Sequence, residues 1–400
     1  MTTARRLRAA HAAPVSTRLP LLEQGFRPFF LLGAAFAVVA VPLWLVALHG
    51  QLEPGGAFGA LQWHAHEMLF GFSTAIIAGF LLTAVSNWTG RETLSGSSLG
   101  LLALLWLLAR GAVFFAARLP KFVPALLDLA FLPALALACA LPLVAAKNRR
   151  NYGFVALLLG LAAANAGAHW AALTGDLETV RLSHLFALNL MVVMLVAMTG
   201  RVLPLFTRNA TRLSWVRAVP LLEHCSLGAL LLLALADLVP RLGVLSAPLA
   251  AAGAVLLAAR SWFWGTRHTA RVPLLWILHA GAWFLPLGLA LKAIAQIAPV
   301  VSVASALHAL TAGALGSLTL GMMARVSLGH SGRALEPKSS MKWAFLSVIA
   351  AALLRIGAPL LPATHYLSAL GIAAALWSAA FAIFLRDYWQ ILLSARADAR

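Results

Sequence analysis

The sequence has little charge. Only 10% of its 400 residues are Asp, Glu, Lys or Arg, whereas 62% are apolar. Water-soluble chains are typically about 25% charged and about 45–50% apolar. The composition therefore excludes an ordinary soluble protein, and the apolar surplus also excludes a disordered chain. Much of the Leu and Ala has to face lipid.

Cysteine is almost absent. Cys139 and Cys225 both lie inside apolar runs, and the chain contains no CxxC, no CxxCH and no zinc-type spacing. This excludes covalent haem attachment through paired cysteines and a cysteine zinc site. Both residues are interpreted as packing residues, because free cysteine is readily buried.

Acidic residues are also scarce, with 12 Asp and Glu against 30 Lys and Arg, so the formal net charge is +18. Such a charge can indicate nucleic-acid binding, depending on where the basic residues lie. A bilayer core needs about 20 apolar residues per helix. Runs of that length predict twelve spans, at 29–50, 62–86, 99–118, 122–146, 152–173, 182–206, 219–239, 243–265, 272–291, 304–325, 343–361 and 366–386.

The basic residues indicate the orientation of these spans. With the N-terminus in the cytoplasm, 23 of the 30 Lys and Arg fall in inner segments and 5 in outer loops, while Arg110 and Arg355 lie within spans. Lys and Arg in short loops are retained on the cytoplasmic side. The charge therefore sets topology, and attraction to anionic lipid of the bilayer is a sufficient role for it. No nucleic-acid partner is expected.

The predicted fold is an all-α, polytopic integral membrane protein, with both termini cytoplasmic. Residues 1–28 are expected to form a basic N-terminal segment with no removable signal peptide. Residues 29–386 form a single transmembrane domain of twelve helices, and residues 387–400 form a cytoplasmic tail.

The spans show signs of a threefold repeat of four-helix units, over 29–146, 152–265 and 272–386. Spans 6 and 10 align without a gap over His184/His308, Met198/Met322, Arg201/Arg325 and Val202/Val326. Span 2 fits the same frame more loosely, starting at His66. A bundle closed around a pseudo-threefold axis would bring His66, His184 and His308 together.

Histidines are the main chemical signal. Seven of the twelve lie at or near the outer helix ends: His49, His64, His66, His169, His184, His308 and His365. Imidazole is a common protein ligand of haem iron and copper, and helix bundles build such sites from facing helices. We therefore predict metal ligands among His64, His66, His169, His184 and His308, and haem contacts by His66, His184 and His308.

The alternatives for single residues stay open. A lone intramembrane histidine such as His169 can serve as a hydrogen-bonding residue between helices, and His64 can be an interfacial polar residue. His64 and His66 are two positions apart, so their side chains point about 200° apart on a regular helix. They would serve two centres, or one would face the aqueous boundary.

Three charged residues accompany the histidines. Glu67 is expected to receive a ring N–H or to carry a proton, and it is the candidate catalytic residue. Arg110 and Arg355 lie too deep to set topology. Each is expected to pair with a haem propionate, with Asp237 or with helix C-terminal carbonyls. A structural ion pair is preferred to a cofactor contact, and both remain candidate cofactor-binding residues.

Several stretches resemble the NnrS family, membrane proteins associated with the bacterial response to nitric oxide. They are GFRPFFLLG (25–33), WHAHEMLFGFSTAIIAGFLLTAVSNWTG (63–90), LLWLLAR (104–110) and MMARVSLGHSGR (322–333). The positions that match the recurring pattern are His64, His66, Glu67, Asn87, Trp88, Gly90, Arg91, His184, His308, Arg325 and His330. The resemblance implies an inner-membrane protein that contains haem and copper and relieves nitrosative stress.

The repeat with its ligands near the outer face also resembles the architecture of haem-copper oxidases and nitric oxide reductases. Span 7 departs from that pattern, because it offers only His224 where those oxidases have two adjacent copper-binding histidines. A standard three-histidine copper site and oxygen reduction are therefore not expected.

Two classes of function follow. The first is a haem and copper protein that binds or reduces nitric oxide; a reductase would need a quinol or a periplasmic electron donor, with Glu67 as a proton donor. The alternative is a transporter or sensor for haem, copper or a species derived from nitric oxide, without redox turnover.

Overall fold

The computed structural model describes residues 19–298 and 300–398. Within these ranges the chain forms helices and connecting turns, with no strand. The fourteen α-helices are α1 (Phe26–Leu48), α2 (Gly59–His66), α3 (Thr74–Thr89), α4 (Gly96–Phe114), α5 (Phe122–Ala145), α6 (Tyr152–Thr174), α7 (Leu177–Thr211), α8 (Pro220–Leu238), α9 (Ser246–Trp262), α10 (Pro273–Ile297), α11 (Val303–His308), α12 (Gly316–His330), α13 (Ser340–Gly357) and α14 (Ala363–Leu393).

Twelve helical stretches are long and apolar enough to cross a membrane, which confirms the predicted all-α polytopic class. Some are longer than their apolar runs, such as Gly56–Thr89, Leu177–Thr211 and Ala363–Leu393. Hydropathy marks only the part of a helix in hydrocarbon, whereas the backbone hydrogen bonds continue into the headgroup region.

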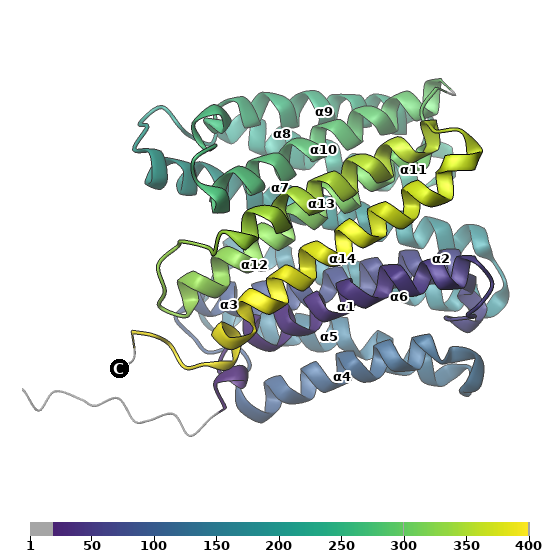
Figure 1. Ribbon diagram of the computed structural model, residues 1–400, viewed down its shortest axis with the longest axis horizontal. Coiled ribbons are helices and arrows are strands. Elements are labelled where there is room, and N and C mark those ends of the chain that lie inside the picture. The colour runs from purple at the N-terminus through teal and green to yellow at the C-terminus, as the bar shows by residue number, and fades with distance from the viewer. Residues whose placement is uncertain (1–18, 299, 399–400) are drawn as a thin grey trace, which may run out of the picture.

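The spans lie side by side, with α8 and α9 at one edge of the bundle and α4 at the other (Figure 1). The first span, α1, packs against the last, α14. The short helices α2 and α11 lie at the end of the bundle opposite the C-terminus (Figure 1). Most of the predicted histidine ligands are at that end, called the outer end below.

Two spans change helix type along their length. The π-helical segments η3 (Glu67–Ser73) and η8 (Ala309–Leu315) begin directly after His66 and His308. These are the histidines that the sequence aligned in spans 2 and 10. The corresponding span 6 is a continuous α-helix, α7. π-Helical turns are rare and occur often at functional sites.

Two basic residues assigned to outer loops lie instead in α-helices. Arg181 belongs to α7, and Lys292 belongs to α10, where it is 8% exposed. Each predicted span stops beside its basic residue, because the apolar run stops there, whereas the α-helix in the structure continues past that residue. Residues 1–18 and Arg400, which carry part of the predicted cytoplasmic charge, lie outside the described residues. The division into three repeats remains a prediction.

Arg27 connects the two ends of the chain. Its side chain is 1% exposed, and Nη1 donates to the carbonyls of Leu392 at 3.0 Å and Ser394 at 2.5 Å. These carbonyls belong to the C-terminal end of α14, where backbone carbonyls have no N–H partner within the helix. A cation at this position also suits the helix dipole.

We expect Arg27→Met to destabilise the protein, because these carbonyls lose a buried charged donor. The loss should be about 2–3 kcal/mol, since hydrogen bonds to charged groups contribute about 1.5–3 kcal/mol. Thermal unfolding in detergent measures it, with the exposed Lys342→Met as the control. Equal midpoints for the two variants would show that the contact is not stabilising.

Candidate functional site

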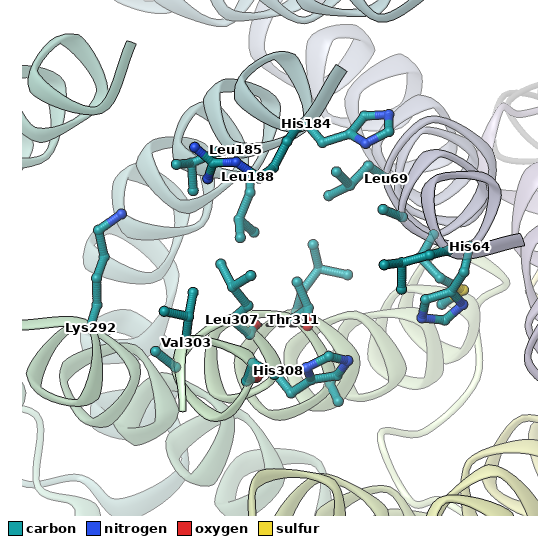
Figure 2. A pocket seen from close by; sticks show the side chains of 18 of the residues that line it. His64, Leu69, His184, Leu185, Leu188, Lys292, Val303, Leu307, His308 and Thr311 are labelled. Carbon is teal, nitrogen blue, oxygen red and sulfur yellow. Dashed lines mark hydrogen bonds between the residues drawn. The ribbon is translucent and has the colours of Figure 1, made fainter. Parts of the chain in front are cut away.

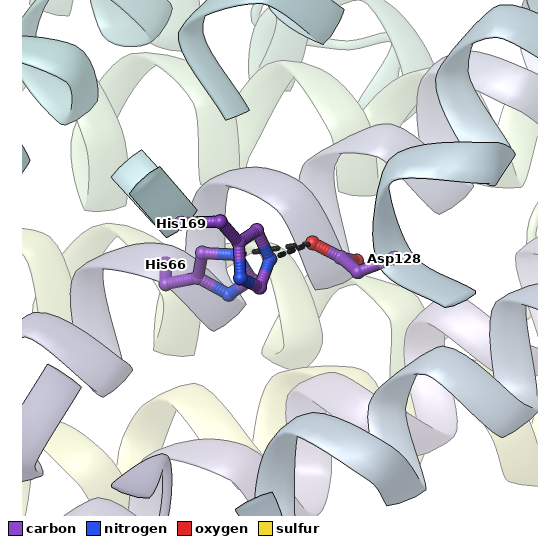
Figure 3. A group of neighbouring side chains, drawn as sticks. All are labelled: His66, Asp128 and His169. Carbon is purple, nitrogen blue, oxygen red and sulfur yellow. Dashed lines mark hydrogen bonds and ion pairs between the residues drawn. The ribbon is translucent and has the colours of Figure 1, made fainter. Parts of the chain in front are cut away.

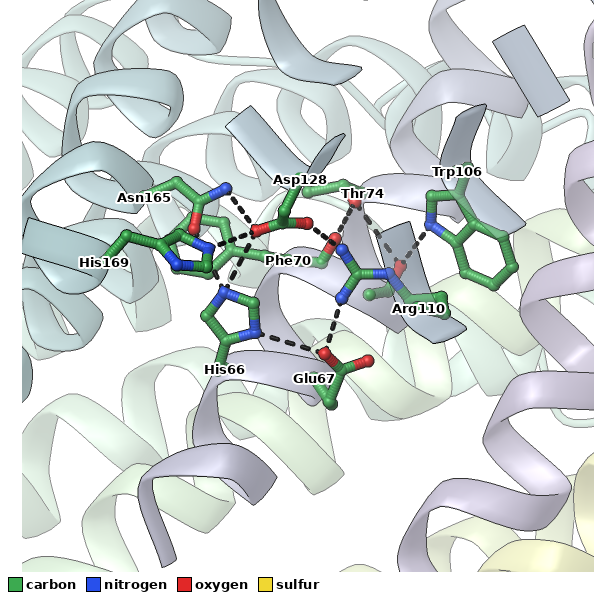
Figure 4. Close-up of polar contacts among 10 residues, drawn as sticks. His66, Glu67, Phe70, Thr74, Trp106, Arg110, Asp128, Asn165 and His169 are labelled. Carbon is green, nitrogen blue, oxygen red and sulfur yellow. Dashed lines mark hydrogen bonds and ion pairs between the residues drawn. The ribbon is translucent and has the colours of Figure 1, made fainter. Parts of the chain in front are cut away.

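A buried polar cluster lies within the first five spans near their outer ends (Figure 4). Helices α2, α4, α5 and α6 and segment η3 each contribute to it. The polar cluster consists of His66, Glu67, Arg110, Asp128, Asn165 and His169, all at most 6% exposed.

Arg110 joins the two carboxylates of the polar cluster. Its Nη1 donates to Glu67 Oε1 at 2.6 Å, and its Nη2 forms an ion pair with Asp128. The sequence left a haem propionate, Asp237 or helix carbonyls as partners for Arg110. The structure corrects this, because both terminal nitrogens are engaged by Glu67 and Asp128. Asp237 pairs with Lys292 instead, at 2.5 Å.

Asp128 is the centre of the polar cluster. Its Oδ2 accepts from Asn165 Nδ2 at 2.8 Å and lies 2.9 Å from His169 Nε2 and 3.1 Å from His66 Nε2. The ligand atoms of His66, Asp128 and His169 lie within 4.8 Å of one another (Figure 3). This buried His/Asp/His group is able to hold a metal ion.

The charges of the polar cluster favour a cation. Glu67 and Asp128 carry two negative charges against one positive charge on Arg110. His66 has oxygens beside both ring nitrogens, with Glu67 Oε1 at 3.2 Å from Nδ1 and Asn165 Oδ1 at 3.1 Å from Nε2. A neutral imidazole carries only one N–H. A proton or a metal ion at this ring would satisfy the remaining oxygens and balance the charge.

Segment η3 positions Glu67 through side chains that bond its backbone. Trp106 Nε1 donates to Gly71 O at 3.1 Å, and Ser73 Oγ donates to Met68 O at 2.6 Å. The Thr74 hydroxyl bonds the carbonyl of Phe70. Buried carbonyls need such partners wherever the regular helical pattern changes.

A cavity of about 780 Å³ lies beside the polar cluster. His64, His184 and His308, from three different spans, line it (Figure 2). His184 Nδ1 lies 3.1 Å from Gln62 Oε1, and its Nε2 is buried with no hydrogen-bond partner among the described residues. His308 Nδ1 donates to Ala304 O at 2.7 Å, which leaves Nε2 as the free acceptor nitrogen.

His64 and His66 face different sites. The His64 ring lines the cavity and stacks on Trp44 with ring centroids 4.3 Å apart. His66 belongs to the polar cluster. Of the two alternatives left open by the spacing of these residues, this arrangement matches the one in which each histidine faces a separate site. The aligned trio is therefore divided: His184 and His308 line the cavity, while the His66 ring lies outside it, 6.0 Å from the His184 ring.

Arg355 lies on the wall of the cavity, away from the polar cluster. Within residues 19–298 and 300–398, no carboxylate lies within 4.0 Å of its guanidinium, and its Nη1 is buried without a hydrogen-bond partner. Its hydrogen bond to Tyr366 does not balance its charge. A cation without a counter-charge is costly at membrane depth.

Sequence reasoning missed Asp128 and Asn165. A signal was present, because Asp128 lies in the apolar run 122–146 and an ionisable residue within a span indicates function. Asn165 carries no charge, so only its place beside Asp128 and His66 shows its role.

These features define an all-α, multi-pass membrane protein in which a buried His/Asp/His group, able to hold a metal ion, lies beside a histidine-lined cavity. The profile of the family described as NnrS protein matches residues 20–396. The chain belongs to the NnrS family, and this membership supports a role in the nitric oxide response. No curated protein matches the chain.

We expect Arg110→Gln to destabilise the protein strongly, because it leaves Glu67 and Asp128 buried without a counter-charge. Removing one partner of a buried ion pair costs about 3–5 kcal/mol. Chemical unfolding in detergent measures the loss, with Arg118→Gln, beyond the outer end of the same span, as the control. A variant as stable as the control would show that Arg110 does not hold the cluster together.

Proposed function

We propose that this chain is a haem- and copper-binding protein of the bacterial inner membrane that binds nitric oxide near the periplasmic face. The observation that carries the proposal is the cavity, in which histidines from three spans surround one apolar space. The bias of Lys and Arg toward the inner segments supports cytoplasmic termini and therefore a periplasmic outer end.

The cavity fits haem in size and in lining. Its volume of about 780 Å³ falls within the range of about 300–1,000 Å³ common for cofactor pockets. Leucines such as Leu185, Leu188 and Leu307 provide an apolar surface for a macrocycle (Figure 2). Arg355 supplies a cation that a haem carboxylate would neutralise, which is the cofactor-binding role proposed for it.

His184 and His308 are the residues best placed to ligate the iron. The contacts to Gln62 and Ala304 orient the two rings through Nδ1, so each presents a neutral Nε2. Such a contact on the second ring nitrogen is the usual way in which a protein orients a metal-binding histidine. Bound haem would supply an iron that binds nitric oxide in an apolar pocket.

The polar cluster fits copper better than a hard cation. His66 and His169 offer two imidazole nitrogens and Asp128 offers one carboxylate oxygen, a donor set that suits copper or zinc more than magnesium or calcium. Arg110 and Asn165 hold the Asp128 carboxylate in place. Copper held by His66, Asp128 and His169 would lie beside the haem cavity.

Turnover would add further requirements. A reductase needs electrons, for which a quinol or a periplasmic protein is the proposed donor, and it needs protons. Glu67 is the proposed proton-carrying residue, because its Oε1 contacts His66 and Arg110 while Oε2 is buried without a partner.

A transporter or sensor for haem, copper or a nitric oxide-derived species is the second candidate function. Segments η3 and η8 favour it, because they alter two spans at matching positions and both line the cavity. Helices interrupted at matching positions are typical of transporters. A transporter would release its haem or copper across the membrane, whereas a resident cofactor stays bound through purification.

The haem site is tested by optical spectra of the purified protein and of its histidine variants. We expect a haem absorption band in the wild type. In His184→Ala or His308→Ala the haem content per chain should fall at least about tenfold, because loss of a hydrogen-bond partner of a metal ligand already lowers metal affinity by about 10–100-fold. The exposed His49→Ala is the control. A wild type without haem from haem-sufficient cells would contradict the proposal.

The copper site is tested by elemental analysis of the same preparations. We expect His169→Gln and Asp128→Asn to lose copper by about 10–100-fold while keeping haem, because both residues belong to the polar cluster only. His308→Ala should lose haem and keep copper. If copper content is unchanged in both cluster variants, the cluster is structural and copper binds elsewhere.

A further inference from the structure

At the outer end of α8 the wall of the cavity is one residue thick. On its outside lies a hollow of about 260 Å³ between α8, the 3₁₀ segment η6 (Pro240–Leu245) and α9. From residue 235 to 249 the chain alternates between the two spaces. Asp237, Pro240, Gly243 and Ser246 line the cavity, whereas Leu235, Leu242, Leu245, Pro248 and Leu249 line the hollow.

The hollow lies on the outside of the bundle. Its lining is entirely apolar, with Leu232, Leu235 and Leu245 exposed by 56%, 47% and 46%. In a membrane-spanning bundle, side chains exposed on the outside of α8 and α9 contact lipid. Helices α8 and α9 form an edge of the bundle (Figure 1).

The residues that separate the hollow from the cavity are small. Ala236 lines both spaces, so only this residue separates them at that point. Gly243 lines the cavity nearby, and a Cβ atom there would meet no other atom within 4 Å. A small backbone displacement of α8 against η6 would therefore connect the two spaces.

We propose that the wall at Ala236 and Gly243 is a lateral portal through which an uncharged diatomic gas passes from the bilayer into the cavity. The proposal rests on the proposed function, in which the gas is nitric oxide. Such a molecule is apolar and concentrates in hydrocarbon, and it is small enough to pass an alanine methyl group. Ions and polar solutes are excluded by the lipid outside and by the leucine lining.

Carbon monoxide rebinding after laser photolysis tests the portal in the haem-loaded, ferrous protein in lipid nanodiscs. We expect Gly243→Leu and Ala236→Leu to slow the association and the dissociation of carbon monoxide by about tenfold each. The dissociation constant should stay unchanged, because a portal changes the energy barrier to entry and exit and not the bound state. Gly228→Leu is the matched control: Gly228 is exposed on the same helix α8, has open space and lines neither pocket. Wild-type rates in both portal variants would overturn the proposal.

Xenon tests the portal independently of haem, because it fills apolar cavities. In crystals of the wild type under xenon pressure we expect xenon density in the hollow and in the adjoining cavity. In crystals of Gly243→Leu the xenon peak on the hollow side should shift its position. A lipid acyl chain held in the hollow, or no xenon on either side of Ala236, would overturn the portal. A protein that takes up xenon there but binds no haem would support the portal and contradict the proposed function.

Discussion

Arg110 holds two carboxylates inside a membrane-spanning bundle, and the neighbouring site depends on this contact. Hydrocarbon offers no water to solvate Glu67 or Asp128, so both remain buried only with a cation beside them. Glu67 belongs to the π-helical segment η3 and Asp128 to α5. The guanidinium therefore ties two spans together through α4, and the held Asp128 in turn orients His66 and His169.

The spans and the outer position of the histidines could be predicted from the sequence because both depend on local properties. A run of about 20 apolar residues leaves a segment such as 122–146 few options besides a membrane helix. The divergence of His64 and His66 follows from helical rotation alone. These two residues accordingly line different sites, although their exact partners depend on distant parts of the chain.

Features that depend on contacts between distant segments could not be predicted in this way. Asn165 gains its role from Asp128, which lies one helix away, and nothing near position 165 indicates that partner. Between Glu67 and Ser73 the π-helical segment η3 has an ordinary apolar sequence, and its altered backbone is held by Trp106, a residue of another span. Lys292 looked like a loop residue because hydropathy does not report its buried pairing with Asp237.

The two sites differ in charge although they share a boundary. Phe58 packs against His66 and His169 of the polar cluster and against His184 of the cavity, with ring centroids 4.7, 5.2 and 6.2 Å apart. On one side of this boundary the carboxylates outnumber Arg110, which suits a metal cation. On the other side Arg355 lacks an acidic partner among the described residues, which suits a ligand with carboxylates. Since like charges repel strongly where the dielectric constant is low, each site disfavours the ligand of the other, although histidines are present in both.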